Sequence, residues 1–123
     1  MHDLGQRGER LVEAKYKALG FKLLERNYIF PHGKQTGELD LVFVKSNELV
    51  FVEVKTRSGN SYGTPFEAVD VNKQRKLVKT AKLYLRFHKQ YQDYDYRIDV
   101  AAVDIDNKDN PVIILVNAIE DLD

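Results

Sequence analysis

The chain has 123 residues, enough for one domain with a hydrophobic core, and we expect a single domain over residues 1–123. Because it has no cysteine, no run of about 18 apolar residues and no apolar secretory signal in MHDLGQRGER, we exclude a disulfide framework and a membrane span and expect a cytoplasmic location. Its 19 basic and 19 acidic side chains give zero net charge, which excludes a uniformly basic nucleic-acid-binding protein.

The spacing of apolar residues predicts two helices and five strands. In chain order these are a helix over 4–20, strands over 21–30, 38–44 and 49–56, a helix over 70–91, and strands over 97–106 and 111–119. Gly20 is a plausible stop for the first helix, and Asp70 is a plausible N-cap for the second. The order αβββαββ predicts a mixed α/β domain whose sheet is built around the hairpin over 38–56.

That hairpin places charged residues inside two otherwise apolar strands. A turn at Ser46–Asn47 pairs residues whose numbers sum to 93, so Asp40 should lie across from Glu53. Two carboxylates with Cβ atoms roughly 5 Å apart destabilise a sheet unless water, a proton or a cation compensates them. Mg²⁺ is a natural occupant, and Lys55 would lie beside it on the face of Glu53. A solvated strand face is the plain alternative.

Alternation along the first strand of the hairpin predicts that Asp40 and Val42 share one face, while Leu39 and Leu41 share the other. Gly37, just before this strand, either allows a close backbone approach beside the site or only ends a turn. The three histidines are scattered along the chain and do not predict a zinc site.

The charges are segregated along the chain. Residues 54–90 carry 9 basic and 2 acidic side chains, and residues 91–123 carry 2 basic and 9 acidic ones. Part of the basic excess forms a stripe along the second predicted helix, consisting of Arg75, Lys79, Lys82, Arg86 and Lys89. Such a stripe indicates either contact with a polyanion or a solvated helix face beside an acidic segment, and charge alone leaves both open.

Asp40, twelve intervening residues and then Glu53-Val54-Lys55 resemble the PD-(D/E)XK nuclease signature. The wider segments GQRGERLVEAKYKALG, GELDLVF, LVFVEVKTR, YGTPFEAV and RIDVAAV resemble, in this order, the uncharacterised YraN family, which is similar in fold to archaeal Holliday junction resolvases. One position departs from the signature, because Leu39 stands where the proline that gives the signature its name would be.

The resemblance implies a restriction-endonuclease-like αβββαβ core, a mixed sheet flanked by helices, with a site for Mg²⁺ (or Mn²⁺). Asp40 and Glu53 match the two metal-binding acids, and the carbonyl of Val54 matches a common backbone ligand. Lys55 matches the catalytic lysine.

Further site residues follow from the same resemblance. Glu9 matches an additional acid on the first helix that completes the metal site, although Glu13, one turn later, is an equal candidate from the residues alone. Gln74 matches a polar helix residue placed over the site, and a satisfied buried amide is its alternative. The candidates for binding nucleic acid are Arg57, Lys73, Arg75, Lys79 and Lys82.

The function implied is a metal-dependent endonuclease that hydrolyses DNA phosphodiester bonds, with branched or damaged DNA as its substrate. The alternative is a non-catalytic DNA-binding module on the same fold; a purely structural partner is a third interpretation. Retention of Asp40, Glu53 and Lys55 together favours the enzyme. Resolvase-like relatives dimerise to cut two strands, which suggests a homodimer.

Overall fold

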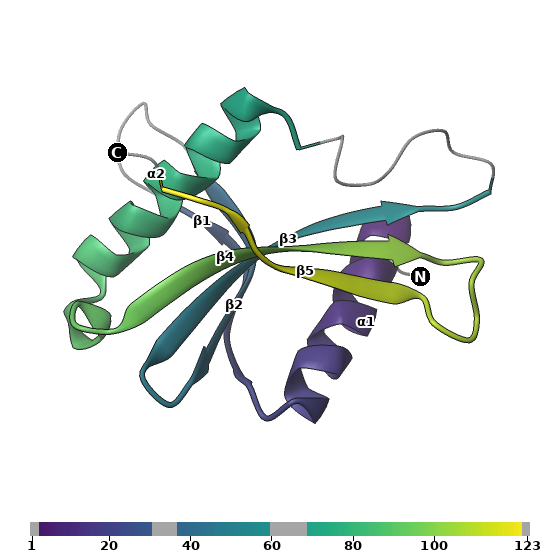
Figure 1. Ribbon diagram of the computed structural model, residues 1–123, viewed down its shortest axis with the longest axis horizontal. Coiled ribbons are helices and arrows are strands. Elements are labelled where there is room, and N and C mark those ends of the chain that lie inside the picture. Colours follow the sequence, from purple (N-terminus) through teal and green to yellow (C-terminus); the bar gives the residue numbers. More distant parts are fainter. Residues whose placement is uncertain (1–2, 31–36, 60–68, 122–123) are drawn as a thin grey trace.

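The computed structural model describes residues 3–30, 37–59 and 69–121, which form a five-stranded mixed sheet with one helix on each face (Figure 1). Its elements are α1 (Leu4–Ala18), β1 (Lys22–Ile29), β2 (Glu38–Lys45), β3 (Glu48–Arg57), α2 (Val71–Phe87), the short 3-10 helix η2 (Lys89–Tyr91), β4 (Asp95–Asp104) and β5 (Val112–Ile119). This order confirms the predicted fold class, with the αβββαβ arrangement of a restriction-endonuclease-like core. No helix in these ranges is both long and apolar enough to cross a membrane.

The strands lie in the order β1-β2-β3-β4-β5. The first three pair antiparallel as a meander, β3 and β4 pair parallel, and β5 returns antiparallel on β4. The parallel pair requires a crossover connection, which contains α2. As a result, β3 and β4 end at the same edge of the sheet.

Each helix covers one face of the sheet and forms its own apolar core. On the α1 side, Tyr16 stacks on Phe43 with ring centroids 4.5 Å apart. On the α2 side, Leu77 and Tyr84 pack over Phe51. Because both faces are covered, β2 and β3 are apolar on both sides rather than alternating.

Helix α1 begins and ends as its sequence predicts. The side chain of Asp3 accepts a hydrogen bond from the backbone N–H of Gln6, and the side-chain oxygen of Gln6 accepts one from the backbone N–H of Asp3, which is a capping box. Gly20 follows the helix with φ of 95°, a conformation that glycine adopts without strain.

Helix α2 is shorter than predicted. Asp70 caps its N-terminus by accepting a hydrogen bond from the Lys73 N–H, as expected. The predicted helix over 70–91 instead ends at Phe87, because Nδ1 of His88 contacts the Tyr84 carbonyl at 2.8 Å and thereby competes for the acceptor of the next helical bond. Lys89 therefore lies outside α2, and the predicted basic stripe is shorter by one residue.

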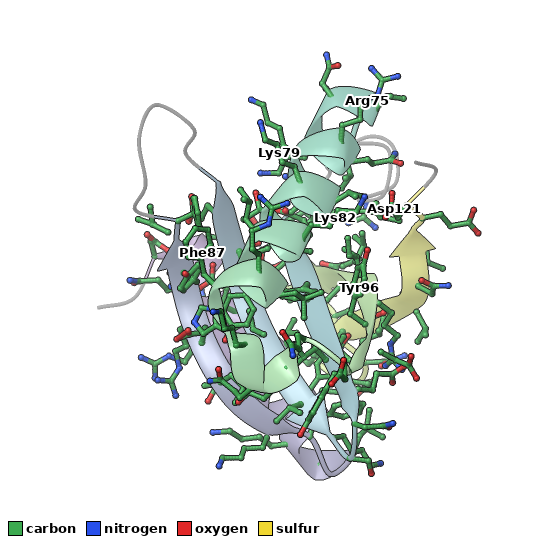
Figure 2. The ribbon with its side chains drawn as sticks, turned by 90° about the vertical axis from the view of Figure 1, so that its left-hand side faces the viewer. Arg75, Lys79, Lys82, Phe87, Tyr96 and Asp121 are labelled. Atoms are coloured by element: carbon green, nitrogen blue, oxygen red, sulfur yellow. The ribbon has the colours of Figure 1, made fainter. Side chains whose placement is uncertain are left out.

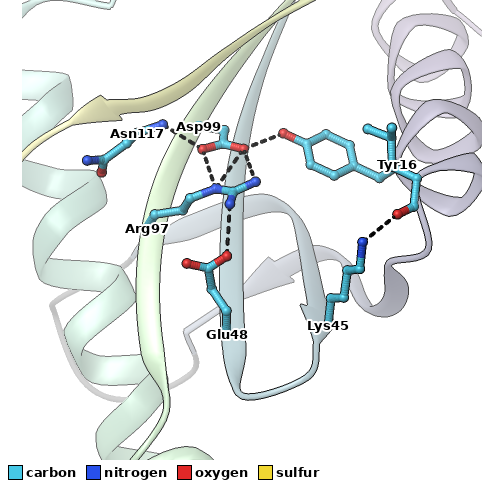
Figure 3. Close-up of polar contacts among 7 residues, drawn as sticks. Tyr16, Lys45, Glu48, Arg97, Asp99 and Asn117 are labelled. Carbon is cyan, nitrogen blue, oxygen red and sulfur yellow. Dashed lines mark hydrogen bonds and ion pairs between the residues drawn. The ribbon is translucent and has the colours of Figure 1, made fainter.

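A buried carboxylate connects α1, β4 and β5 on the α1 side of the sheet (Figure 3). Asp99 of β4 is fully buried and accepts hydrogen bonds from the Tyr16 hydroxyl at 2.7 Å and from the Asn117 N–H at 2.8 Å. Arg97 donates to the same carboxylate at 3.1 Å and also to Glu48 at 2.8 Å. These contacts give Arg97 and Asp99 a structural role.

Two glycines allow the helices to approach the sheet closely. A Cβ added to Gly8 of α1 would lie 2.9 Å from the Cβ of Thr56 in β3, and one added to Gly37 would lie 2.7 Å from Cγ2 of Thr80 in α2. Both distances are shorter than van der Waals contact, so no side chain fits without a shift. The close approach at Gly37 that the sequence suggested is confirmed.

We expect Gly8→Ala to destabilise the fold by about 1–3 kcal/mol, because its methyl group overlaps Thr56. Gly5→Ala in the same helix is the matched control, since an added Cβ there meets nothing nearer than Asp3 Oδ1 at 3.5 Å. Its stability should be unchanged or slightly raised, by helix propensity alone. Urea unfolding compares the two variants, and a Gly8→Ala protein as stable as wild type would contradict the close contact.

Candidate functional site

The register of the central hairpin brings the two predicted acids to the same place. The regular pairs run from the turn at Ser46–Asn47 to Leu41 opposite Val52, and their numbers sum to 93, as predicted. Asp40 and Glu53 are the next residues along the two strands. The carboxyl groups lie within hydrogen-bonding reach, so that a protonated Glu53 can donate to Asp40.

The backbone is irregular at Asp40. Its carboxylate accepts a hydrogen bond from the backbone N–H of Val54 at 2.8 Å, so the side chain lies against β3. Leu39 packs in the α2 core, whereas Leu41 packs in the α1 core. The prediction that Leu39 and Leu41 lie on the same face of the sheet is therefore wrong, because the side-chain alternation breaks at Asp40 between them.

Glu53 is a buried acid whose charge is poorly compensated. Only 5% of the surface of Glu53 is exposed to solvent. Burial first, and the charge of Asp40 second, raise the pKa of Glu53 to about 7. The ammonium groups of Lys73 and Lys55 lie 3.7 Å and 4.0 Å from its carboxylate and lower the pKa, but less than burial and Asp40 raise it. A further cation would therefore stabilise the ionised pair.

The donor chemistry of this pair fits a hard divalent ion. Mg²⁺ binds through one or two carboxylates and takes its other oxygens from water or phosphate. Within residues 3–30, 37–59 and 69–121, no three His, Cys, Asp or Glu side chains converge closely enough to hold an ion. Asp40 and Glu53 are the two carboxylates that could hold such an ion directly, and Glu9 as a third ligand stays a prediction. The carbonyl of Val54 as a ligand stays a prediction.

The structure distinguishes the two candidate acids on α1. Burial and the charge of Asp40 raise the pKa of Glu9, which places Glu9 within electrostatic reach of the pair. Glu13 instead receives two hydrogen bonds from Arg26, at 2.7 Å and 2.9 Å, and these contacts help to hold the pKa of Glu13 at about 2. Glu9 is the acid of α1 beside the site, and Glu13 belongs to a structural ion pair.

Helix α2 contributes one lysine to the acidic pair. Lys73, in the first turn, makes the 3.7 Å contact with Glu53. Gln74, the next residue, donates from Nε2 to the carbonyl of Val69 at 3.0 Å. That contact fits the alternative of a satisfied amide. Among the residues that the structure describes, the Gln74 side chain bonds to Val69 and not to Asp40 or Glu53.

The remaining basic candidates lie away from the acidic pair. Arg75, Lys79 and Lys82 line one side of a groove of about 460 Å³, with Asp121 on its other side (Figure 2). Lys82 forms an ion pair with Asp121 at 2.7 Å, so part of its charge is already compensated. Arg57 is the last residue of β3, two residues beyond Lys55 along the strand.

Sequence reasoning missed one polar residue beside the site. Asn27 of β1 lies opposite Asp40 in the register and has a positive φ of 50°. Its side chain hydrogen-bonds to Glu9, which lowers the pKa of that acid. An asparagine inside a predicted strand was the available signal, because asparagine tolerates this conformation better than most residues.

Known proteins similar to this chain span most of its length. The family described as "Uncharacterised protein family UPF0102" matches residues 8–103. A UPF0102 protein of Chlorobium chlorochromatii (strain CaD3) is 41% identical over 103 residues, which are 84% of this chain and 75% of that protein. A UPF0102 protein of Alkaliphilus metalliredigens (strain QYMF) is 39% identical over 115 residues, or 94% and 96% of the two chains.

Replacing Glu53 with glutamine should stabilise the metal-free protein at pH 8. The folded-state pKa of about 7 exceeds the ordinary value of 4.5, so folding takes up a proton between these values and stability falls as the pH rises through this window. Glu53→Gln removes that loss, and we expect a gain of about 2–3 kcal/mol at pH 8 and none below pH 4.5.

Urea unfolding in EDTA at pH 4 and pH 8 measures this difference. Glu13→Gln is the matched control with the opposite sign. The pKa of Glu13 is lowered to about 2, so its charge stabilises the fold above the ordinary pKa of 4.5, and its removal should destabilise the protein at pH 8. Equal stability of wild type and Glu53→Gln at pH 8 would show that the lysines fully compensate Glu53.

Proposed function

Because the chain belongs to the uncharacterised protein family UPF0102, the YraN family that its motifs predicted, we propose its function from the chemistry of its own site. We infer that it is a metal-dependent endonuclease that hydrolyses DNA phosphodiester bonds. The observation that carries this proposal is the pairing of Asp40 with a buried Glu53 whose pKa is raised to about 7. A non-catalytic protein has no need for two such acids, whose proximity costs stability.

The acidic pair would hold Mg²⁺ or Mn²⁺. When bound, such an ion polarises a phosphate and lowers the pKa of a coordinated water. The Val54 N–H would keep the Asp40 carboxylate in place through its 2.8 Å hydrogen bond. Glu9 would hold a water next to Asp40, because its own carboxyl group lies within reach of that charge.

Two lysines would act on the phosphate. Lys55 lies 4.0 Å from Glu53 and is half-buried, so its charge would act with little screening by solvent. It would stabilise the negative charge that develops on the phosphate oxygens. Lys73 approaches Glu53 from α2 and would orient the same phosphate from the other side. On this proposal the protein acts in the cytoplasm, where bacterial DNA lies.

We expect Lys55→Ala to lower the single-turnover cleavage rate by a factor on the order of one hundred or more, with little change in DNA affinity, because its charge matters most in the transition state. Lys22→Ala is the control, since Lys22 pairs with Val44 beside the hairpin turn, away from the acids. The substrates are linear, flapped and four-way DNA with Mg²⁺, Mn²⁺ or EDTA. Binding without cleavage under any metal would identify a DNA-binding module instead.

The basic residues of α2 generate a prediction about salt. If Arg75 and Lys79 contact phosphates, replacing both with alanine should weaken binding to every DNA sequence and flatten the dependence of log affinity on log salt by about one to two units. Lys82→Ala should have a smaller effect, because Lys82 is paired with Asp121 at 2.7 Å. Fluorescence anisotropy over a salt series measures the slopes. An unchanged slope in the double variant would assign these residues to a solvated helix face.

A further inference from the structure

Two rows of neighbouring residues cross the sheet from the site and end at exposed apolar side chains on β5. On the face covered by α2, each row begins at a site residue of β3, crosses β4 and ends on β5. The two rows are Glu53–Val100–Leu115 and Lys55–Ala102–Ile113. Neighbouring strands lie about 4.8 Å apart, so the backbones of Leu115 and Ile113 lie about 10 Å from those of Glu53 and Lys55.

The ends of these rows are open to solvent. Leu115 is 44% exposed and Ile113 is 57% exposed, whereas Val100 and Ala102 in the middle of the rows are buried. Helix α2 therefore leaves β5 uncovered at these two positions, although Ile119 at the end of β5 packs in the α2 core, and an apolar surface remains there. An exposed apolar surface beside a charged site indicates contact with a ligand that has apolar as well as charged parts.

The charges along α2, on the same face of the sheet, indicate which ligand that is. The groove of about 460 Å³ between α2 and the end of β5 has Arg75 and Lys79 on its α2 side and Val71, itself 59% exposed, at its start. Its other side carries Asp121, which is held by Lys82 and by the Tyr96 hydroxyl (Figure 2). The cations of α2 therefore favour phosphate binding along the helix, and the carboxylate of Asp121 disfavours it at the end of β5.

We propose that Ile113 and Leu115 contact unpaired nucleobases next to the scissile phosphate, an inference that rests on the proposed function. Base faces are stacked inside an intact duplex, whereas an unpaired strand offers them to apolar side chains while its phosphates bind cations. Isoleucine and leucine also act as wedges at base steps that have been opened. The substrate class is therefore DNA with an unpaired segment at the cut, such as a flap or a junction.

The test compares flapped DNA with fully paired DNA that has the same number of phosphates. The variant carries Ile113→Thr and Leu115→Thr, because threonine keeps the strand propensity while it removes apolar surface. Binding is measured in EDTA by fluorescence anisotropy, so that cleavage does not enter. We expect the variant to lose affinity for flapped DNA by a factor on the order of ten and for paired DNA by less than about twofold.

Leu19→Thr is the matched control, because Leu19 is 52% exposed and follows α1, where its carbonyl accepts a hydrogen bond from Lys45 beside the hairpin turn. It should change neither affinity. A second measurement uses the unaltered protein and a 2-aminopurine at the first unpaired position. Its fluorescence should change on binding if the base leaves its neighbours and packs on the protein, and should not change in the paired duplex.

Equal losses on both DNAs, or no loss and no 2-aminopurine response, would overturn the assignment. It would also be overturned by a wild-type dimer in sedimentation equilibrium that the double variant dissociates, because a second copy would then cover β5. If the protein prefers flapped DNA but cleaves no DNA with any metal, the proposed nuclease activity is refuted and the contact of β5 with unpaired bases stands. If it cleaves DNA but does not prefer flapped DNA, the nuclease activity stands and the contact of β5 with unpaired bases is refuted.

Discussion

The fully buried carboxylate of Asp99 is the interaction on which the arrangement of the other elements depends. It holds the Tyr16 hydroxyl of α1 at 2.7 Å and the Asn117 N–H of β5 at 2.8 Å. Through Arg97, the same network reaches Glu48 at the start of β3. A buried charge must be fully hydrogen-bonded, so these elements have one permitted arrangement around it. Helix α1, thus fixed, brings its other end to the site.

Two glutamates show how environment decides what an acid does. Glu13 has a bidentate arginine, and the pKa of Glu13 is held at about 2, so its charge contributes to the stability of the fold. Glu53 is buried beside Asp40, with lysines only at 3.7 Å and 4.0 Å, and its pKa is raised to about 7. The fold therefore carries a destabilised charge at Glu53, which is characteristic of functional sites.

The element order and the register of the hairpin could be predicted because they follow from local patterns. A two-residue turn and an apolar hairpin determine the register as far as Leu41 opposite Val52, the residues next to Asp40 and Glu53. The burial of Glu53 and the approach of Lys73 could not be predicted, because they depend on how α2 crosses the sheet. The break in alternation at Asp40 also escaped prediction, since it comes from a side chain that bonds to the neighbouring strand.

The contact between Gly8 and Thr56 has a consequence for how the sequence can vary. In the chain, Gly8 precedes Glu9 and Thr56 follows Lys55, so this contact sets the separation of α1 and β3 beside the site. Thr56 Oγ1 is buried there with no hydrogen-bond partner among residues 3–30, 37–59 and 69–121. Positions 8 and 56 should therefore change together: a side chain at position 8 is tolerable only when position 56 becomes smaller.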